Sequence, residues 1–178
     1  DNKIYCSSDA EFSAELYDGD HLLERGNSLN GELAFTVPEP KLWTAETPEL
    51  YTVKLCTEGE TITRRVGFRT IAISADNELL INGTPVKLKG VNHHDTDPEK
   101  GWTMSSADIL RDLKLMKRLN INCVRTSHYP PSPEFLDYCD ELGLYVILET
   151  DIETHGFVRR YANVGYGYDV DDTIWPCA

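Results

Sequence analysis

The fold is decided by NCVRTSHYPPSPEFLDYCDELGLYVILET, residues 122–150. The first residues, 122–126, predict a strand, and residues 132–142 predict a helix with a serine cap and a proline in its first turn. Gly143 is well placed to end that helix. Residues 144–148 are almost continuously apolar, as expected of a parallel strand that is covered on both faces. The order strand, helix, strand with short connections is typical of an α/β unit.

The same order extends toward the N-terminus. Residues 86–91 predict a further strand, and residues 105–116 predict a helix, with Ser105 or Ser106 as its cap and apolar positions recurring every three or four residues. A (β/α)₈ barrel takes about 250 residues, which is far more than this part of the chain offers. We therefore expect residues 76–178 to be the N-terminal part of an incomplete TIM barrel, comprising its first three strands.

Residues 1–75 have a different pattern, with short alternating strands, frequent turn signals and no convincing helix. The clearest element is a hairpin of residues 50–56 and 62–66, whose second strand is expected to continue to Ile73. Several short strands of this kind predict a β-sandwich. Because an immunoglobulin-like domain takes about 100 residues, residues 1–75 are expected to be the C-terminal part of such a domain.

Composition excludes several classes of partner. The 178 residues include 17 Lys and Arg against 30 Asp and Glu, which gives a net charge of −13. Such a chain repels the phosphate backbone of nucleic acids, and no apolar run approaches the roughly 20 residues of a membrane helix. The five cysteines are scattered and show no CxxC spacing, so we expect reduced thiols in a cytoplasmic protein.

Polar clusters follow each of the three predicted parallel strands, at residues 92–95, 125–128 and 149–155, and they include four of the five histidines. The carboxyl ends of parallel strands meet at one edge of a sheet, where α/β barrels carry their sites. The alternative for any single cluster is an ordinary polar strand end. The agreement of all three clusters favours a common site.

Individual residues in these clusters suggest particular chemistry. Glu153 and His155 lie two apart, so on an extended segment both would face one side and could bind Mg²⁺ or Mn²⁺, or Zn²⁺ through the imidazole; a simple hydrogen-bonded pair is the alternative. His94 and His128 either bind a polar ligand or cap a strand. Arg125, at the inner end of a barrel strand, implies an acidic partner.

Five segments together resemble successive motifs of glycoside hydrolase family 2, in the right order and over nearly the whole chain. They are LWTAETPELY (42–51), VGFRTIAI (66–73), LLINGTPVKLKGVNHHD (79–95), NCVRTSHYP (122–130) and LDYCDELGLYVILETDIETHGF (136–157). The RTSHYP stretch is shared with the β-glucuronidases of the family. The IETHG stretch is similar to that of its large multidomain bacterial β-galactosidases.

This resemblance implies an enzyme that removes terminal non-reducing β-D-galactose from lactose-type β-galactosides with retention, and that assembles as a homo-oligomer. It also implies that Glu153 and His155 are the protein ligands of an active-site Mg²⁺. His94 and His128 match histidines that contact the galactosyl group, and Arg125 matches an arginine that positions the nucleophilic carboxylate.

Two further expectations concern substrate binding and catalysis. Asn92 and Asp151 are expected to bind substrate, although Asp151 replaces an amide that the family commonly has in its DEAN motif. A retaining glycosidase needs two carboxylates about 5–5.5 Å apart, and the resemblance implies that both lie beyond Ala178. The chain is therefore expected to be a fragment of the enzyme that is inactive alone.

Three alternatives remain open from the sequence. The chain could belong to a β-glucuronidase or β-mannosidase of the same family. It could also be part of a metal-dependent barrel hydrolase in which the histidines bind zinc. A third possibility is a non-catalytic carbohydrate-binding module.

Overall fold

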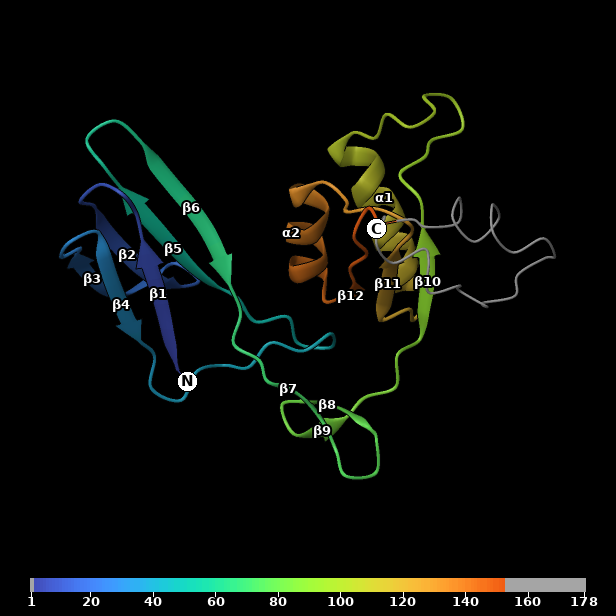
Figure 1. Ribbon diagram of the computed structural model, residues 1–178, viewed down its shortest axis with the longest axis horizontal. Coiled ribbons are helices and arrows are strands. Elements are labelled where there is room, and N and C mark those ends of the chain that lie inside the picture. Colours follow the sequence, from blue (N-terminus) through green and yellow to red (C-terminus); the bar gives the residue numbers. More distant parts are fainter. Residues whose placement is uncertain (1, 153–178) are drawn as a thin grey trace, which may run out of the picture.

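The computed structural model describes residues 2–152. The strands preceding the first helix are β1 (Lys3–Ser7), β2 (Ser13–Asp18), β3 (His21–Asn27), β4 (Glu32–Thr36), β5 (Tyr51–Cys56), β6 (Thr61–Val66), β7 (Ile71–Ile73), β8 (Leu79–Ile81), β9 (Thr84–Pro85) and β10 (Gly90–His93). They are followed by α1 (Ser106–Arg118), β11 (Cys123–Thr126), α2 (Pro133–Leu142) and β12 (Tyr145–Ile147). Figure 1 shows a sandwich at one end, an α/β unit at the other, and the small β7–β9 sheet between them.

The sandwich packs a β1–β4 pair against the antiparallel sheet β3-β2-β5-β6. The buried residues of β1 and β2 alternate along each strand (Ile4 and Cys6, Ala14 and Leu16), and they form one core with Phe35 of β4 and Val53 of β5. Alternation of this kind is what a sheet with one covered face requires. The predicted β-sandwich is present, while its immunoglobulin-like character stays a prediction.

Two details of this region differ from expectation. The predicted strand from residue 62 to Ile73 is interrupted: β6 ends at Val66, and β7 pairs with β8 in a separate sheet. The sequence pattern also did not indicate β3, because six of its seven residues are exposed and it therefore lacks apolar alternation. The predicted domain division, between residues 75 and 76, falls in the turn that joins β7 to β8.

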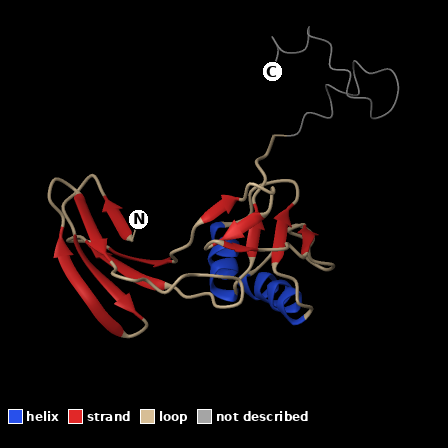
Figure 2. Ribbon diagram, turned by 90° about the horizontal axis from the view of Figure 1, so that it is seen from below, coloured by secondary structure: helices blue, strands red, loops and turns tan. Residues whose placement is uncertain are grey.

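The α/β unit follows the predicted order. β10, β11 and β12 form a parallel sheet in which β11 is central, and α1 and α2 are the two crossover connections. Figure 2 shows both helices on the same face of this sheet, where they share a core with Val124 and Leu144. The arrangement agrees with the start of a TIM barrel, while barrel closure stays a prediction.

The strand predicted over residues 86–91 begins later than expected, at Gly90. The backbone before it bonds to one side chain: Asn122 Oδ1 accepts from the N–H of Lys89 at 2.7 Å, and Asn122 Nδ2 donates to the carbonyl of Lys87 at 3.1 Å. An asparagine thus supplies hydrogen bonds that a neighbouring strand would otherwise supply. This replacement could not be predicted from apolar periodicity.

A loop at residues 41–50 joins the sandwich to the α/β unit. Its Trp43 is 1% exposed, donates its indole N–H to the carbonyl of Asp140 in α2 at 2.8 Å, and lies edge-on to Tyr145 of β12. Two residues further, the carbonyl of Ala45 accepts from Lys117 Nζ of α1 at 2.8 Å. Both helices and β12 therefore hold the same loop.

Two further properties concern the described part of the chain. Neither α1 nor α2 is long and apolar enough to span a membrane. Among residues 2–152 the cysteines are unpaired, and they are Cys6, Cys56, Cys123 and Cys139.

Candidate functional site at the carboxyl edge of the parallel sheet

The candidate site lies where β10, β11 and β12 end. Asn92 and Arg125 are register partners in neighbouring strands, and Arg125 pairs in turn with Ile147 of β12. Successive side chains alternate between the faces of a strand. Val124 packs in the core with the helices, so these three residues lie on the other face. There they line a hollow of about 310 Å³.

Arg125 connects the three strand ends through all three guanidinium nitrogens. Its Nε donates to Oε1 of Glu149, its Nη1 donates to Oδ1 of Asn92 at 3.2 Å, and its Nη2 lies 3.3 Å from Nδ1 of His128. A planar guanidinium has five N–H groups in a fixed arrangement, which suits this three-way contact. Among the described residues the acidic partner of Arg125 is Glu149, whereas the expected pairing of Arg125 with the nucleophilic carboxylate stays a prediction.

The two candidate histidines lie together. The rings of His94 and His128 meet edge-on with their centroids 5.5 Å apart, and Tyr129 is tilted against His94 at 6.1 Å. The hydroxyl of Tyr129 accepts from the backbone N–H of Asp95 at 2.9 Å, which ties the end of β10 to the turn after β11. Half of the His128 side chain is exposed, so it is accessible to a ligand.

The structure thus brings together four predicted site residues, namely Asn92, His94, Arg125 and His128. Asp151 is exposed, just beyond Glu149 in the chain. Glu153 and His155, the predicted metal ligands, lie outside the described residues. Within residues 2–152, no group of three or more His, Cys, Asp or Glu is arranged to hold a metal ion.

Glu149 is a site residue to which sequence reasoning assigned no role. Its backbone N–H donates to Thr126 Oγ1 at 3.0 Å, and its carboxylate contacts both Arg125 and His128. The sequence signal for Glu149 was its position directly after the predicted apolar strand of residues 144–148, at the same end of its strand as the other polar clusters. That signal does not distinguish Glu149 from the acidic residues that follow it.

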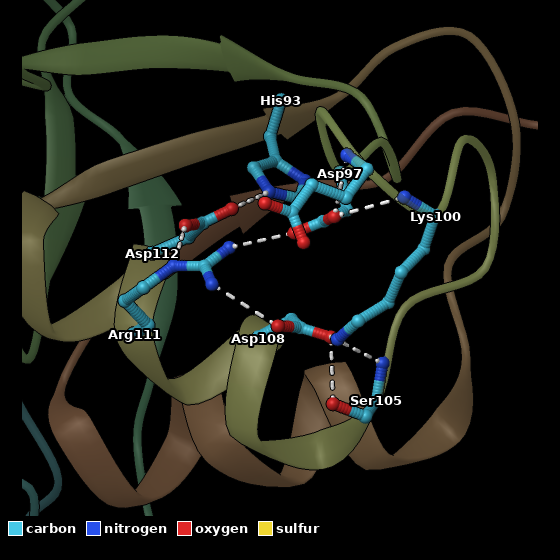
Figure 3. Close-up of polar contacts among 8 residues, drawn as sticks. His93, Asp97, Lys100, Ser105, Asp108, Arg111 and Asp112 are labelled. Atoms are coloured by element: carbon cyan, nitrogen blue, oxygen red, sulfur yellow. Dashed lines mark hydrogen bonds and ion pairs between the residues drawn. The ribbon is translucent and has the colours of Figure 1, made fainter.

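A second polar network lies behind this site. His93 follows Asn92 in β10 and therefore points to the opposite face, where its Nε2 lies 3.3 Å from Asp112 of α1 and its Nδ1 lies 3.5 Å from Asp95. Figure 3 shows how this contact continues through Arg111, which also reaches Asp97 and Asp108. The network ties α1 to the loop that follows β10.

Asp108 is the most strongly held carboxylate of this network. It is 6% exposed in its side chain and accepts from Lys100 Nζ at 2.7 Å and from the hydroxyl of Ser105, the N-cap of α1, at 2.6 Å. These hydrogen bonds, from Lys100 first and then Ser105, hold the pKa of Asp108 far below its usual range.

This lowered pKa predicts a pH-dependent effect of Asp108→Asn. A carboxylate whose pKa is lower in the folded state stabilises that state above its unfolded pKa of about 4, and the contribution is lost as the pH falls below that value. We expect the variant to have a lower free energy of unfolding than the wild type at pH 7. The two values should approach each other progressively as the pH falls below about 4 in urea titrations. A difference that does not change with pH would contradict this expectation.

Comparison with known proteins identifies the family of both regions. Residues 6–69 match the model described as glycosyl hydrolases family 2, and residues 71–177 match the model of its TIM barrel domain. The β-galactosidase of Staphylococcus xylosus is 45% identical over 156 residues, and that of Arthrobacter sp. strain B7 is 48% identical over 133 residues. These alignments cover 85% and 75% of this chain, but the chain spans only 16% and 13% of those relatives.

A solved structure supports the same relationship. The β-glucuronidase of Faecalibacterium prausnitzii superposes with a TM-score of 0.71 and 32% sequence identity, over 80% of this chain and 24% of that one. The two family models together cover the sandwich from residue 6, the parallel strands and the polar strand ends. The chain belongs to glycosyl hydrolases family 2.

Proposed function

We propose that this chain is part of a β-galactosidase that hydrolyses terminal β-D-galactose residues with retention. The observation that carries the proposal is the convergence of Asn92, His128 and Glu149 on Arg125, beside His94, at the carboxyl edge of the sheet. The similarity to β-galactosidases at 45–48% identity supports the choice of substrate. Closure of the sheet into a complete barrel is part of the proposal.

In this proposal the described residues bind and orient rather than break the glycosidic bond. His94, His128 and Asn92 would hydrogen-bond sugar hydroxyl groups, and Asp151 would contact substrate from the end of β12. Each Nη of Arg125 keeps a second N–H, and these remaining donors would position the nucleophilic carboxylate. Hydrogen bonds that become stronger as the sugar ring flattens lower the barrier, since only such interactions raise the rate.

The two catalytic carboxylates of this mechanism are proposed to come from outside the 178 residues. Glu149 is an unsuitable nucleophile because its carboxylate is paired with Arg125 and His128. The purified chain is therefore expected not to hydrolyse a nitrophenyl β-galactoside. Appreciable turnover by the 178-residue polypeptide would contradict this assignment.

His128→Ala in the natural enzyme that carries this sequence should lower kcat/KM for galactosides by about 10- to 100-fold, because a hydrogen bond to the transition state is lost. Its effect on the free energy of unfolding should stay within about 0.5 kcal/mol, since the side chain is half exposed. His21→Ala is the matched control, because His21 is an exposed histidine in β3 of the sandwich. Equal losses of rate and stability would instead make His128 a structural residue.

A divalent cation belongs to the same proposal. Glu153 and His155 offer a carboxylate and an imidazole, a donor set that fits Mg²⁺ or Mn²⁺ when water completes the coordination. When bound, such an ion would supply positive charge beside the acid/base carboxylate. The proposed cytoplasmic location is supported by the cysteines among residues 2–152, which are unpaired, and homo-oligomeric assembly is proposed from the family resemblance alone.

A β-glucuronidase is the second candidate, because the chain superposes on structures with that name. A glucuronidase requires a cation for the carboxylate of its sugar. Among the described residues around His94 and His128, Arg125 is paired with Glu149, and this proposal assigns its remaining N–H groups to the nucleophile, so Arg125 is not available for a sugar carboxylate. Rates measured with nitrophenyl β-galactoside, β-glucuronide and β-mannoside decide between the candidates, and a faster glucuronide reaction would overturn the proposal.

A further inference from the structure

Nδ1 of His128 lies between two groups of opposite hydrogen-bonding character. It is 3.3 Å from Nη2 of Arg125 and 3.4 Å from Oε2 of Glu149. A guanidinium can only donate, and an ionised carboxylate can only accept. A bare Nδ1 satisfies the arginine, whereas a protonated Nδ1 satisfies the glutamate. The two neighbours therefore favour different tautomers of the same imidazole.

The geometry favours the arginine. The N–H of Arg125 Nη2 is directed at Nδ1 as in a hydrogen bond, whereas the contact between Nδ1 and Glu149 has only the distance of an ion pair. Glu149 is already engaged elsewhere, because its Oε1 accepts from Nε of the same arginine and its backbone N–H donates to Thr126. The glutamate thus fixes the guanidinium, and the guanidinium faces the imidazole.

We propose that Arg125 keeps His128 in the tautomer that carries its proton on Nε2, and that Glu149 is the positioning residue that holds Arg125 for this purpose. Nε2–H is a hydrogen-bond donor, so His128 would select a ligand oxygen that can accept. This inference rests on the proposed function for the identity of that ligand, a hydroxyl oxygen of a neutral sugar. It deepens that function by assigning the direction of one hydrogen bond.

Substitutions of the two members of this ion pair are expected to affect the tautomer of His128 differently. Arg125→Met removes the donor and leaves Glu149 as the charged neighbour of Nδ1, so the proton should move to Nδ1. Glu149→Gln keeps an oxygen for Arg125 and places an amide, which can also donate, beside Nδ1, so the proton should stay on Nε2. A purely structural role of the pair would change both variants in the same way.

The experiment uses the 178-residue chain labelled with ¹⁵N-histidine and records long-range ¹H–¹⁵N correlations at about pH 9, where ordinary imidazole is uncharged. His128→Gln identifies the signals of His128. We expect a bare Nδ1 and a protonated Nε2 in the wild type and in Glu149→Gln. In Arg125→Met we expect most His128 side chains to have a protonated Nδ1 and a bare Nε2. Asn92→Ala is the matched control, because it removes a partner of the same guanidinium at Nη1 and should leave the tautomer unchanged.

Two results would overturn the proposal: a protonated Nδ1 in the wild type, or an unchanged tautomer in Arg125→Met with the signals of His21 and His93 intact. If the methionine variant does not fold, Glu149→Gln remains decisive, because a protonated Nδ1 in that variant, which keeps Arg125 and lacks the charged acceptor, would contradict control of the tautomer by Arg125. Galactose binding is measured separately, in the natural enzyme that carries this sequence. Weaker binding in His128→Ala supports the sugar contact, and unchanged binding with the tautomers as expected would contradict the proposed function alone.

Discussion

Trp43→Ala is expected to lower the free energy of unfolding by about 3–5 kcal/mol, the usual cost of removing a large buried aromatic side chain. Trp43 is 1% exposed and packs between Tyr145 and the guanidinium of Arg69, which lies 4.9 Å from the ring centre. The substitution also leaves the carbonyl of Asp140 without its indole donor. Urea titration of the purified protein, monitored by far-ultraviolet circular dichroism, measures the decrease in the free energy of unfolding.

The matched control is Trp102→Ala, because Trp102 is the same residue type at 88% exposure. Its removal should change the free energy of unfolding by less than about 0.5 kcal/mol, as is usual for exposed positions. Similar losses in the two variants would show that the indole of Trp43 is not held between the sandwich and the α/β unit.

Gly143→Ala is expected to cost about 2–5 kcal/mol, from two sources that the structure separates. Gly143 ends α2 with a φ of 76°, a left-handed conformation that costs other residues about 1–2 kcal/mol. A β-carbon at this position would also lie 2.4 Å from the carbonyl oxygen of Ala45, and relieving such a contact costs about 1–3 kcal/mol more.

Gly83→Ala measures the first source alone. Gly83 has the same φ of 76°, but a β-carbon there would meet nothing within 4 Å. The control should therefore show only the conformational cost, and the difference between the two alanine variants in urea titrations should be about 1–3 kcal/mol. Equal costs would mean that the 41–50 loop moves away from α2 without penalty.

The α/β unit could be predicted from the sequence almost completely, because local signals and tertiary structure agree there. The serine caps of α1 and α2, the apolar stripe of α1 and the glycine after α2 all have the expected roles. The sandwich was less predictable. Its strand β3 has mostly exposed residues. Within the α/β unit, the exception is the start of β10, which depends on the side chain of Asn122, more than thirty residues away in the chain. Contacts of that kind leave no periodic pattern.

The candidate site was predictable in place but not in detail. Parallel strands bring their carboxyl ends together, so the convergence of Asn92, Arg125 and His128 followed from strand order alone. The choice of Glu149 as the partner of Arg125 did not follow, because several acidic residues succeed β12 and the spacing does not rank them. The opposite directions of Asn92 and His93 follow from the alternation of a strand, but their partners do not.

The 41–50 loop also has a consequence for chimeric proteins. An exchange of the sandwich between two members of the family, cut at the chain boundary near residue 75, would separate Trp43 and Ala45 from the groups of α1, α2 and β12 that receive them. A recombined protein would therefore have to inherit both sides of this contact from one parent. Whether the exchanged parts fit together depends on these contacts between the 41–50 loop and the α/β unit, rather than on where the two chains are joined.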